Sequence, residues 1–499
     1  MNTPQSPDMS ESSDHAAVIR QLAGPTRSIV FVSGNFNIVH PGHLRLLSFA
    51  AECGDFLVIG VKDNSSPGAK LSEEMRLEGV RAISLVDYAF VLPEPPEAFI
   101  DRLKPAVVVK GKEFENRSNP EQAVLDGYGG KLLFSSGEVR FSSLDLLRRE
   151  YFETNLSSIR KPTEFPRRHG FDSRNLGASL EAFRKVRVLV LGDLIVDEYI
   201  NCDPIGMSQE DPTIVVTPIE NKRFVGGAGI VAAHAKGLGA QVNYLTIAGN
   251  DEPAWFAKQT LKKYNVNHTI FTDDSRPTTL KQRFRAEGKT LLRVSHLRQH
   301  DASAALVKKI LDAVKAVLAN IDLIIFSDFN YGCLPQGLVN PVIEAAKARG
   351  ISMVADSQAS SQISDISRFR GMKLITPTER EARLALRDQN SGLAVVAEEL
   401  RKKADAENVV ITLGAEGLLT HARNSTEWIT DQLPTFNTAP KDTAGAGDSF
   451  LTCASLGLAT GLDIWRSVYL GSIAAACQVS RVGNTPLTQA DLIAEIDAP

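Results

Sequence analysis

The sequence predicts an α/β protein with two domains. Short apolar runs alternate with amphipathic stretches over most of the chain, which is the pattern of βαβ units on parallel sheets. At 499 residues, the chain is too long for one ordinary hydrophobic core. A segment rich in Pro, Arg, Ser and Asn interrupts the alternation. We therefore expect a disordered tail over residues 1–26, a first domain over 27–150, a linker over 151–180 and a second domain over 181–499.

The composition fits a globular protein that binds small molecules. Hydrophobic residues make up 43% and charged residues 23% of the chain, which is enough apolar material for sizeable cores. A formal net charge of -4 argues against a generally basic surface for nucleic acids. The five cysteines lie far apart, which suits reduced thiols and a cytoplasmic enzyme. No apolar run approaches the roughly 20 residues of a membrane span, and the N-terminal stretch does not resemble a signal peptide.

Both domains show strand and helix patterns. In the first, buried strands are predicted at residues 29–32, 56–59, 89–92 and 107–109. In the second, alternating residues between 198 and 225 indicate antiparallel strands outside the main sheet, which would form a small β lid. The other patterns of the second domain are strands at 186–193, 242–247, 323–327, 352–356, 374–376 and 409–413 and a helix over 304–318.

A first chemical motif follows the first predicted strand. His40 and His43 stand at the start of an amphipathic helix, with Pro41 at an early helical position. Backbone N–H groups at a helix start attract phosphates, so the two imidazoles would flank a polyphosphate. Two alternatives remain open: the histidines could be zinc ligands or surface residues at a helix cap. No neighbouring Cys or carboxylate completes a zinc set, and the adjacent glycines favour the phosphate interpretation.

This segment resembles the cytidylyltransferase-like nucleotidyltransferases, whose signature is a glycine, a phenylalanine and then H-x-G-H after the first strand. The resemblance implies a Rossmann-like fold and transfer of a nucleotidyl group from ATP, or from CTP as the alternative, onto a phosphate. His40 and His43 would act in catalysis by stabilising the charge that grows on the α-phosphate. The residues implied to bind the nucleotide or its phosphates are Gly34, Phe36, Gly42, Arg76, Lys110 and Gly111.

Three departures from this family bear on catalysis. Asn37 stands where the family has Asp, which removes a negative charge from the phosphate-binding loop. Residues 112–114 differ from the acidic residue and Tyr that follow the family's K-G, and residues 141–143 keep only part of its S-T-T stretch. We expect the fold to survive these changes. The alternative is a catalytically inactive nucleotide-binding module attached to an active kinase.

A second chemical motif lies near the end of the chain. Residues 442–450 read Asp-Thr-Ala-Gly-Ala-Gly-Asp-Ser-Phe and lead into an apolar helical pattern. The small residues would let backbone N–H groups at the helix start close around a transferring phosphoryl group. Asp448, at the end of this loop, can accept the proton of an attacking hydroxyl, so we predict that it is the general base. The alternative is a glycine-rich turn with a capping Asp.

This string resembles the ribokinase family of carbohydrate kinases, over about residues 186–496. The resemblance implies a ribokinase-like fold, ATP and Mg²⁺ as cofactors, and a Glu381 that organises the metal ion. Thr378 and Ile230 stand where the family has Asn, so the substrate can differ from that of its best-known members. The residues implied to contact the sugar are Asp193, Asp197, Gly226 and Gly227. Those implied to bind the nucleotide or phosphates are Thr412, Gly414, Gly417, Thr443, Gly445, Ala446 and Gly447.

Together, the two halves resemble the bifunctional heptose kinase and adenylyltransferase family of bacterial ADP-heptose synthesis, with the domain order reversed. Residues 208–212 and 327–329 also look like that family's kinase. The resemblance implies a kinase acting at C1 of a heptose 7-phosphate and transfer of AMP to a heptose 1-phosphate. Lys281, Arg283 and Arg293 could bind the distal phosphate or could form a solvated strand face.

We expect sugar phosphates and nucleotides as partners, no nucleic acid and no membrane, and a homodimer formed through the lid. A second hypothesis keeps both activities for another sugar or polyol phosphate.

Overall fold

In the computed structural model, the chain divides into two compact units. The first comprises Met1–Thr154, Asp388–Val396 and Asn424–Gln432, and the second comprises Asn155–Arg387, Ala397–Arg423 and Leu433–Pro499. The residues that the structure describes are 14–115, 119–135, 159–208, 210–211, 213–286, 289–358, 365–424 and 427–498.

The first unit is organised around a parallel sheet with the strand order β3-β2-β1-β4-β5. The order changes direction between β1 and β4, and α/β proteins bind ligands outside the carboxyl ends of strands at such a point. The strands are β1 (Ile29–Gly34), β2 (Phe56–Lys62), β3 (Tyr88–Leu92), β4 (Val107–Gly111) and β5 (Lys131–Ser135). The helices are α1 (His15–Ala23), α2 (Pro41–Glu52), α3 (Glu73–Arg81), α4 (Pro96–Leu103), η1 (Lys112–Phe114) and α5 (Pro120–Asp126).

Helix α1 corrects the expectation of a disordered tail through residue 26. Asp14 caps the helix by accepting a hydrogen bond from the Ala16 N–H at 3.2 Å. Ile19 is fully buried in the hydrophobic core of this unit, and Arg20 donates to the backbone carbonyls of α4. The apolar positions of this short segment form one face of a helix, a signal hidden by the polar composition around it. Residues 1–13 lie outside the described residues.

The second unit is built on a larger sheet with the order β10-β9-β6-β13-β14-β15-β16-β17-β18. The strands run parallel from β10 to β16, and β17 is antiparallel to β16. All the main-sheet strands predicted for the second domain are present. Their bounds are β6 (Arg187–Gly192), β9 (Gln241–Ala248), β10 (Asn267–Thr272), β13 (Leu323–Asp328), β14 (Ser352–Ser357), β15 (Leu374–Ile375), β16 (Val409–Thr412), β17 (Leu418–Asn424) and β18 (Glu427–Leu433).

Helices connect these strands, as expected for βαβ units. The predicted helix over 304–318 is α11 (Ala304–Val317). The others are α9 (Ala228–Gly237), α10 (Glu252–Lys263), η4 (Leu318–Asn320), α12 (Gln336–Lys347), η5 (Ile366–Arg368), α13 (Glu379–Leu386), α14 (Leu393–Ala404), η6 (Gly414–Glu416), α15 (Ala446–Ala459), α16 (Ile464–Val479) and α17 (Gln489–Asp497).

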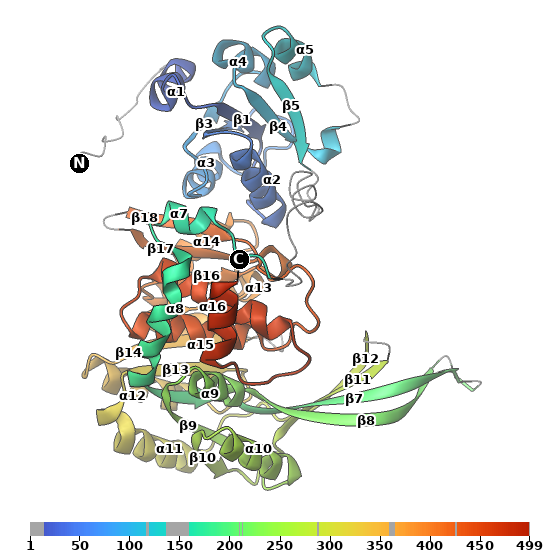
Figure 1. Cartoon of the computed structure of the whole chain (residues 1–499), viewed down its shortest axis with the longest axis vertical. Helices are drawn as coiled ribbons and strands as arrows, with labels where there is room; N and C mark the ends of the chain where they lie inside the picture. The colour runs from blue at the N-terminus through green and yellow to red at the C-terminus, as the bar shows by residue number, and fades with distance from the viewer. Residues whose placement is uncertain are drawn as a thin grey trace. The chain divides into compact units, whose positions relative to one another are not determined.

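The predicted lid is a separate sheet with the order β12-β11-β7-β8. Strands β7 (Leu194–Met207) and β8 (Ile214–Gly227) form the antiparallel pair that the sequence indicated. Strands β11 (Thr279–Ala286) and β12 (Lys289–His296) join them, with β11 parallel to β7. Figure 1 shows these strands extending away from the main sheet of the second unit. Lys281 and Arg283 lie on β11 and Arg293 on β12, in accord with the strand that one interpretation of these residues implied.

The segment predicted as a linker contains helical turns that pack on the second unit. Phe165 is 1% exposed and its ring lies 6.4 Å from that of Tyr469 on α16. The Lys161 ammonium donates to the carbonyls of Glu495 and Ile496 at 2.8 Å, at the C-terminal end of α17. These turns are α7 (Glu164–Arg168), η2 (Ser173–Asn175), α8 (Leu176–Ser179) and η3 (Leu180–Lys185).

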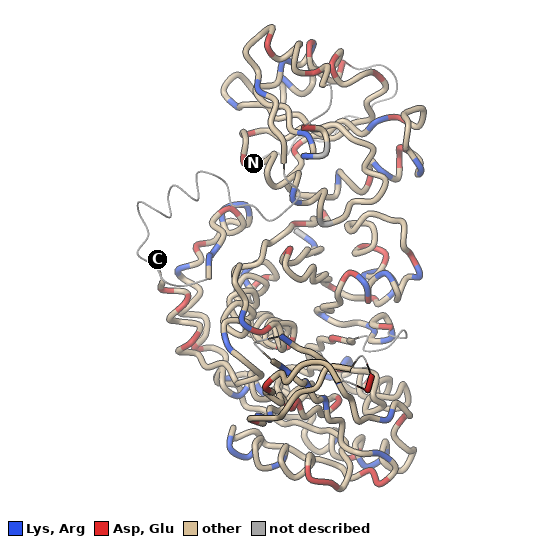
Figure 2. The backbone as a smooth tube through the Cα atoms, turned by 90° about the vertical axis from the view of Figure 1, so that its right-hand side faces the viewer, with Lys and Arg blue, Asp and Glu red and all other residues tan. Residues whose placement is uncertain are grey.

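Charges of both signs are interspersed along the two units, as Figure 2 shows. This distribution accords with a net charge of only -4. Within the described part of the chain, every helix is too short or too polar to cross a membrane.

Candidate active sites

The H-x-G-H motif lies between β1 and α2, beside the point where the order of the first sheet changes direction. His40 is the N-cap of α2, and its Nδ1 accepts a hydrogen bond from the Gly42 N–H at 3.1 Å. The Nδ1 of His43 lies 3.0 Å from the carbonyl oxygen of Ile38. A carbonyl can only accept, so His43 carries its proton on Nδ1, whereas neutral His40 carries its proton on Nε2.

The two imidazoles stack, with ring centroids 4.0 Å apart. Burial, and then the charge of His40, lower the pKa of His43 to about 4. His43 is therefore neutral near pH 7, and a bound polyphosphate would favour its protonated form. Phe36 completes this face of the loop, because its ring lies 5.1 Å from that of His43 and beside Gly34.

Arg76 connects the loop after β1 to the loop after β2. Its guanidinium is 1% exposed and donates to the carbonyls of Leu71 at 2.9 Å, Asn35 at 2.8 Å and Lys62 at 2.6 Å. A fourth hydrogen bond reaches Oδ1 of Asn64 at 3.1 Å. These four acceptors are neutral, so the site keeps the positive charge of Arg76. Phosphate contact by this residue stays a prediction.

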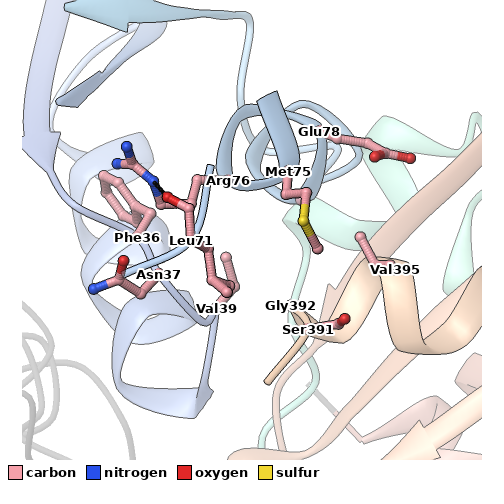
Figure 3. A pocket seen from close by; sticks show the side chains of 11 residues that line it. Phe36, Asn37, Val39, Leu71, Met75, Arg76, Glu78, Ser391, Gly392 and Val395 are labelled. Carbon is pink, nitrogen blue, oxygen red and sulfur yellow. Dashed lines mark hydrogen bonds between the residues drawn. The ribbon is translucent and has the colours of Figure 1, made fainter. Parts of the chain in front are cut away.

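Asn37 holds the loop after β2 with both ends of its amide. Its Nδ2 donates to the carbonyl of Gly68 at 2.8 Å, and its Oδ1 accepts from the N–H of Lys70 at 2.7 Å. Figure 3 shows Asn37 beside Phe36, Leu71 and Arg76. A carboxylate could accept from Lys70 but could not donate to Gly68. The replacement of the family's Asp by Asn therefore matches the local backbone.

Lys110 lies at the end of β4, next to β1, but its ammonium has a partner. It forms an ion pair with Glu121 at 2.8 Å, with side chains 15% and 6% exposed, and lies 5.0 Å from the centroid of the Phe114 ring. The predicted nucleotide contact of Lys110 and Gly111 stays a prediction. Residues 112–114 form η1, and residues 141–143 lie outside the described residues.

The zinc alternative for His40 and His43 gains no support. Among the described residues, no group of three or more His, Cys, Asp or Glu side chains is placed to hold a metal ion.

The glycine-rich loop of the second unit leads directly into α15, whose first residue is Ala446. Gly445 is the N-cap with φ 77°, a left-handed conformation that favours glycine, and a Cβ there would overlap Oδ1 of Asn484. Gly447 has open space around its Cα. The Ala446 N–H lies 3.4 Å from the carbonyl of Thr443. The start of α15 is therefore kept free of bulky side chains, as an anion-binding loop requires.

Asp442 fastens this loop to its surroundings. Its Oδ1 accepts from the Ala444 N–H at 3.1 Å. Its Oδ2 accepts from the Tyr199 hydroxyl at 2.8 Å and from the Gly483 N–H at 3.0 Å. The loop is thus anchored to the lid strand β7 as well as to the segment after α16.

Asp448 lies in the first turn of α15 and is 5% exposed. Its Oδ1 has no hydrogen-bond partner in the described part of the chain. Burial, and then the charge of Asp197, raise its pKa to about 7, and the charge of Lys281 acts in the opposite direction. A carboxylate with a pKa near neutrality suits a general base.

The base of the lid brings together several residues predicted to contact the sugar. Asp197 forms a buried ion pair with Arg283. A Cβ on Gly226 would overlap Oδ2 of Asp197, so glycine is required there. Gly227 is the N-cap of α9, and Ile230 is fully buried within that helix.

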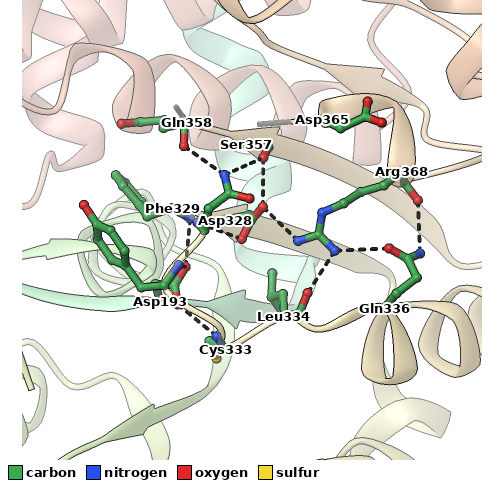
Figure 4. A network of polar contacts seen from close by, with 12 residues as sticks. Asp193, Asp328, Phe329, Cys333, Leu334, Gln336, Ser357, Gln358, Asp365 and Arg368 are labelled. Carbon is green, nitrogen blue, oxygen red and sulfur yellow. Dashed lines mark hydrogen bonds and ion pairs between the residues drawn. The ribbon is translucent and has the colours of Figure 1, made fainter. Parts of the chain in front are cut away.

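Asp193 does not point into open space. Its two carboxylate oxygens accept backbone N–H groups of Phe329 at 2.8 Å, Tyr331 at 3.3 Å and Cys333 at 3.1 Å. Figure 4 shows this contact beside the buried ion pair of Asp328 and Arg368, at 2.8 Å. In this structure, Asp193 positions the loop after β13. Direct sugar contact by Asp193 stays a prediction.

Glu381 lies at the start of α13 in a capping box with Thr378. Thr378 Oγ1 accepts from the Glu381 N–H at 3.3 Å, and Glu381 Oε2 accepts from the Thr378 N–H at 2.8 Å. Thr378 therefore caps the helix in place of the family's Asn. Thr412 of β16 forms a β-bridge with Thr378, and Gly414 and Gly417 follow it in a turn with positive φ angles.

Asp356 was missed by the sequence analysis. Burial, and then the charges of Glu381 and Asp448, raise its pKa well above the usual range, so three buried carboxylates lie near one another. A signal was present, because Asp356 ends a predicted strand, and the carboxyl ends of parallel strands form sites in α/β folds.

The sequence comparisons agree with this geometry. Residues 187–490, more than half of the 499 residues, match the profile of the pfkB family carbohydrate kinase. The chain belongs to the pfkB family of carbohydrate kinases. In this pfkB-family chain, residues 31–128 match the cytidylyltransferase-like profile. The predictions of two α/β domains, with a cytidylyltransferase-like fold first and a ribokinase-like fold second, are confirmed.

Two relatives of this pfkB-family protein share the name bifunctional protein HldE. The chain is 30% identical to the bifunctional protein HldE of Geotalea uraniireducens over 318 residues, which cover 63% of this chain and 63% of that protein. It is 31% identical to the HldE of Helicobacter hepaticus over 314 residues, covering 62% and 63% of the two chains. The matched stretch thus spans under two thirds of these relatives.

Solved structures support the kinase fold. Phosphofructokinase-2 from Escherichia coli, in complex with substrates and products, superposes with a TM-score of 0.52 at 17% identity. The match covers 63% of this chain and 100% of that chain. At this low identity, the superposition shows a shared fold alone.

Proposed function

We propose that this chain is a bifunctional kinase and nucleotidyltransferase that acts on heptose phosphates. Its kinase domain phosphorylates C1 of a heptose 7-phosphate with ATP. After a separate phosphatase has removed the 7-phosphate, its N-terminal domain transfers AMP from a second ATP to the heptose 1-phosphate, giving ADP-heptose and pyrophosphate. We place the first domain over residues 14–150, so that it includes α1, the second over 181–499, and the enzyme in the cytoplasm. The observation that supports the kinase most directly is Asp448, whose Oδ1 has no hydrogen-bond partner among the described residues and lies beside an unobstructed helix start.

In the kinase step, Asp448 takes the proton of the C1 hydroxyl as the hydroxyl oxygen attacks the γ-phosphorus of ATP. The bond from that phosphorus to the β,γ-bridging oxygen breaks, and ADP leaves. The Gly447 N–H, in the unobstructed first turn of α15, faces the transferring phosphoryl group and stabilises its negative charge, whereas the Ala446 N–H donates to the Thr443 carbonyl. The pKa of about 7 for Asp448 allows it to accept the proton near neutral pH.

The buried carboxylates suit Mg²⁺, which binds through one or two carboxylates together with substrate phosphates and water. Asp356 and Glu381 would hold the ion. The fit rests on the burial of these two carboxylates, each 6% exposed; among the described residues no third His, Cys, Asp or Glu completes a metal-binding group with them. Bound Mg²⁺ would neutralise charge on the ATP phosphates.

In the nucleotidyl transfer, a phosphate oxygen of the sugar 1-phosphate attacks the α-phosphorus and pyrophosphate leaves. His40 offers its Nε2–H to the phosphates, since its Nδ1 is an acceptor for Gly42. His43 becomes a second donor when the negative charge of bound nucleotide raises its pKa from about 4. ATP is the proposed nucleotide, with CTP as the alternative.

The lid also supports a homodimer. Strands β7 and β8 expose large apolar side chains that a monomer would leave in water, including Ile205 at 66%, Met207 at 60% and Ile219 at 71%. A second copy of the same lid would cover them. Sedimentation of the wild type and of Ile219→Glu tests this: we expect a dimer that the substitution weakens, and a monomeric wild type would contradict it.

The activity test uses the full chain with ATP or CTP and a panel of sugar phosphates, with ADP and pyrophosphate measured separately. We expect ADP with heptose 7-phosphate and pyrophosphate with heptose 1-phosphate. Asp448→Ala should abolish only the first reaction and His43→Ala only the second. Loss of both activities through either substitution would contradict independent sites, and equal use of other sugar phosphates would contradict the heptose assignment.

A second candidate treats the N-terminal domain as a non-catalytic nucleotide-binding module. It is favoured by Asn37, whose amide serves the backbone, and by the ion pair that engages Lys110. Equilibrium dialysis with labelled ATP and CTP separates the candidates. Nucleotide binding that His43→Ala abolishes, without pyrophosphate from any substrate, would support the module.

A further inference from the structure

Lys281 of β11 has an unusual environment at the base of the lid. Its ammonium lies 5.1 Å from the ring centroid of Phe329 and 5.2 Å from that of Tyr331. It forms no hydrogen bond or ion pair with any described residue. Two aromatic faces attract a cation without using its N–H donors. The ammonium is therefore held in place with its donors available.

The charged residues beside Lys281 on this face of β7 and β11 are engaged, whereas Arg293 of β12, opposite Arg283, is exposed. In the parallel pairing of β11 with β7, Lys281 lies opposite Asp197 and Arg283 opposite Tyr199, so these residues share one face. Asp197 is neutralised by its ion pair with Arg283. The guanidiniums of Arg283 and Arg285 also lie 5.3 Å and 5.1 Å from the Tyr199 ring centroid. Because Asp197 pairs with Arg283, it forms no ion pair with Lys281.

Asp448 provides a second, independent observation. It is 5% exposed, and its Oδ1 has no partner among the described residues. Lys281 is near enough for its charge to lower the pKa of Asp448, yet the two form no ion pair. Asp448 Oδ1 is a buried acceptor without a donor, and the Lys281 ammonium is a donor without an acceptor, among the described residues. A ligand that supplies both groups would stabilise this site. Such a ligand carries a hydroxyl for Asp448 and an anionic group for Lys281.

We propose that Lys281 is the specificity-determining residue that selects a phosphorylated sugar over a neutral one, by binding the anionic group of the acceptor. The inference rests on the proposed kinase function and assigns one role within it. Asp193 acts as a positioning residue, because its three backbone hydrogen bonds hold the loop that carries Phe329 and Tyr331. Arg283 has the structural task of pairing with Asp197.

The test compares Lys281→Met with the wild type on matched pairs of acceptors, each with and without its terminal phosphate: a heptose and its 7-phosphate, and D-mannose and its 6-phosphate. Lys281→Met removes the charge but keeps the length of the side chain. We expect the KM for the phosphorylated acceptor to rise roughly 10- to 100-fold, the KM for ATP to stay constant, and the preference for the phosphorylated member to disappear.

Lys289→Met is the matched control, because Lys289 lies on β12 of the same lid, is exposed and takes the identical substitution. An equal loss in Lys289→Met would mean a general effect of positive charge and would overturn the proposal. Equal losses for phosphorylated and neutral acceptors in Lys281→Met would also overturn it, since the lysine would then act on the transferring phosphoryl group. Circular dichroism confirms that both variants fold.

Binding by calorimetry without ATP separates this inference from the proposed function. If the wild type prefers phosphorylated sugars other than heptoses and Lys281→Met loses that preference, the heptose assignment fails and the role of Lys281 stands. If Lys281→Met binds each sugar phosphate as tightly as the wild type does, the inference fails, whatever the substrate.

Discussion

Gly226 of β8 lies directly against the carboxylate of Asp197 on β7, where any Cβ would overlap Oδ2. Gly226→Ala should displace Asp197 and disturb its ion pair with Arg283. A shift of about 1 Å in such a site costs on the order of 10²-fold in rate. We therefore expect kcat/KM of the kinase reaction to fall roughly 100-fold with nucleotidyl transfer unchanged. Gly337→Ala is the control, since a Cβ there meets nothing within 4 Å.

Asn37→Asp restores the residue that related nucleotidyltransferases have, yet we expect it to harm this protein. The aspartate loses the donor to Gly68 and places a carboxylate against a carbonyl oxygen. Because this hydrogen bond is exposed, its loss costs about 0.5 to 1.5 kcal/mol, measurable as a lower free energy of unfolding in urea. Asn340→Asp is a matched change, because Asn340 accepts from Gln336 through Oδ1 and an aspartate keeps that bond. An Asn37→Asp variant more stable than the wild type would contradict the role of the Asn37 amide in holding the loop after β2.

The kinase reaction should lose rate as the pH falls through about 7, because Asp448 must be ionised to accept a proton. The charge of Lys281 lowers this pKa, so Lys281→Met should move the acidic limb of the kcat/KM profile to higher pH. The measurement is kcat/KM from about pH 5.5 to about pH 9 at saturating ATP and Mg²⁺. A flat profile across neutrality would exclude Asp448 as the general base.

Asp448→Asn should abolish the kinase and stabilise the fold at alkaline pH. In the folded protein the pKa of Asp448 is about 7, above the ordinary aspartate pKa of about 3.9, so protonation of Asp448 favours folding. This contribution is complete below the unfolded pKa and is lost as the pH rises through about 7. An asparagine side chain is neutral at every pH, so the variant avoids the cost of ionising a buried carboxyl group. We expect a gain of about 1 to 4 kcal/mol at pH 8 that shrinks towards pH 5, measured by urea unfolding.

Thr378→Ala should weaken the start of α13, because its hydroxyl accepts the Glu381 N–H. Loss of such a cap costs about 1 kcal/mol of unfolding free energy. Thr378→Ser and Thr378→Asn keep a capping oxygen and should remain close to the wild type. Thermal melts of the three variants test this order, and an alanine variant as stable as serine would contradict the capping role.

Much of both sites follows from local sequence patterns. The string that ends in Asp448 identified a helix start with small residues, and α15 begins there at Ala446. His40 likewise stands at the N-cap of α2, as its position before Pro41 predicted. Such features depend on neighbours in the chain, so a single sequence reveals them. A single sequence does not reveal the pairing of β11 with β7, because the two strands are far apart in the chain.

By itself, the sequence determined the alternation of strands and helices, the two phosphate-binding helix starts and the family of each half. These properties arise from short-range steric and hydrogen-bonding preferences. Only the tertiary structure decided which charged groups are engaged: Lys110 with Glu121, Arg283 with Asp197, and Asp193 with the loop after β13. It also placed Lys281 against two aromatic rings, with no hydrogen bond or ion pair to any described residue. The physical reason is that each partner comes from a distant part of the chain, and burial makes the presence or absence of that partner decisive.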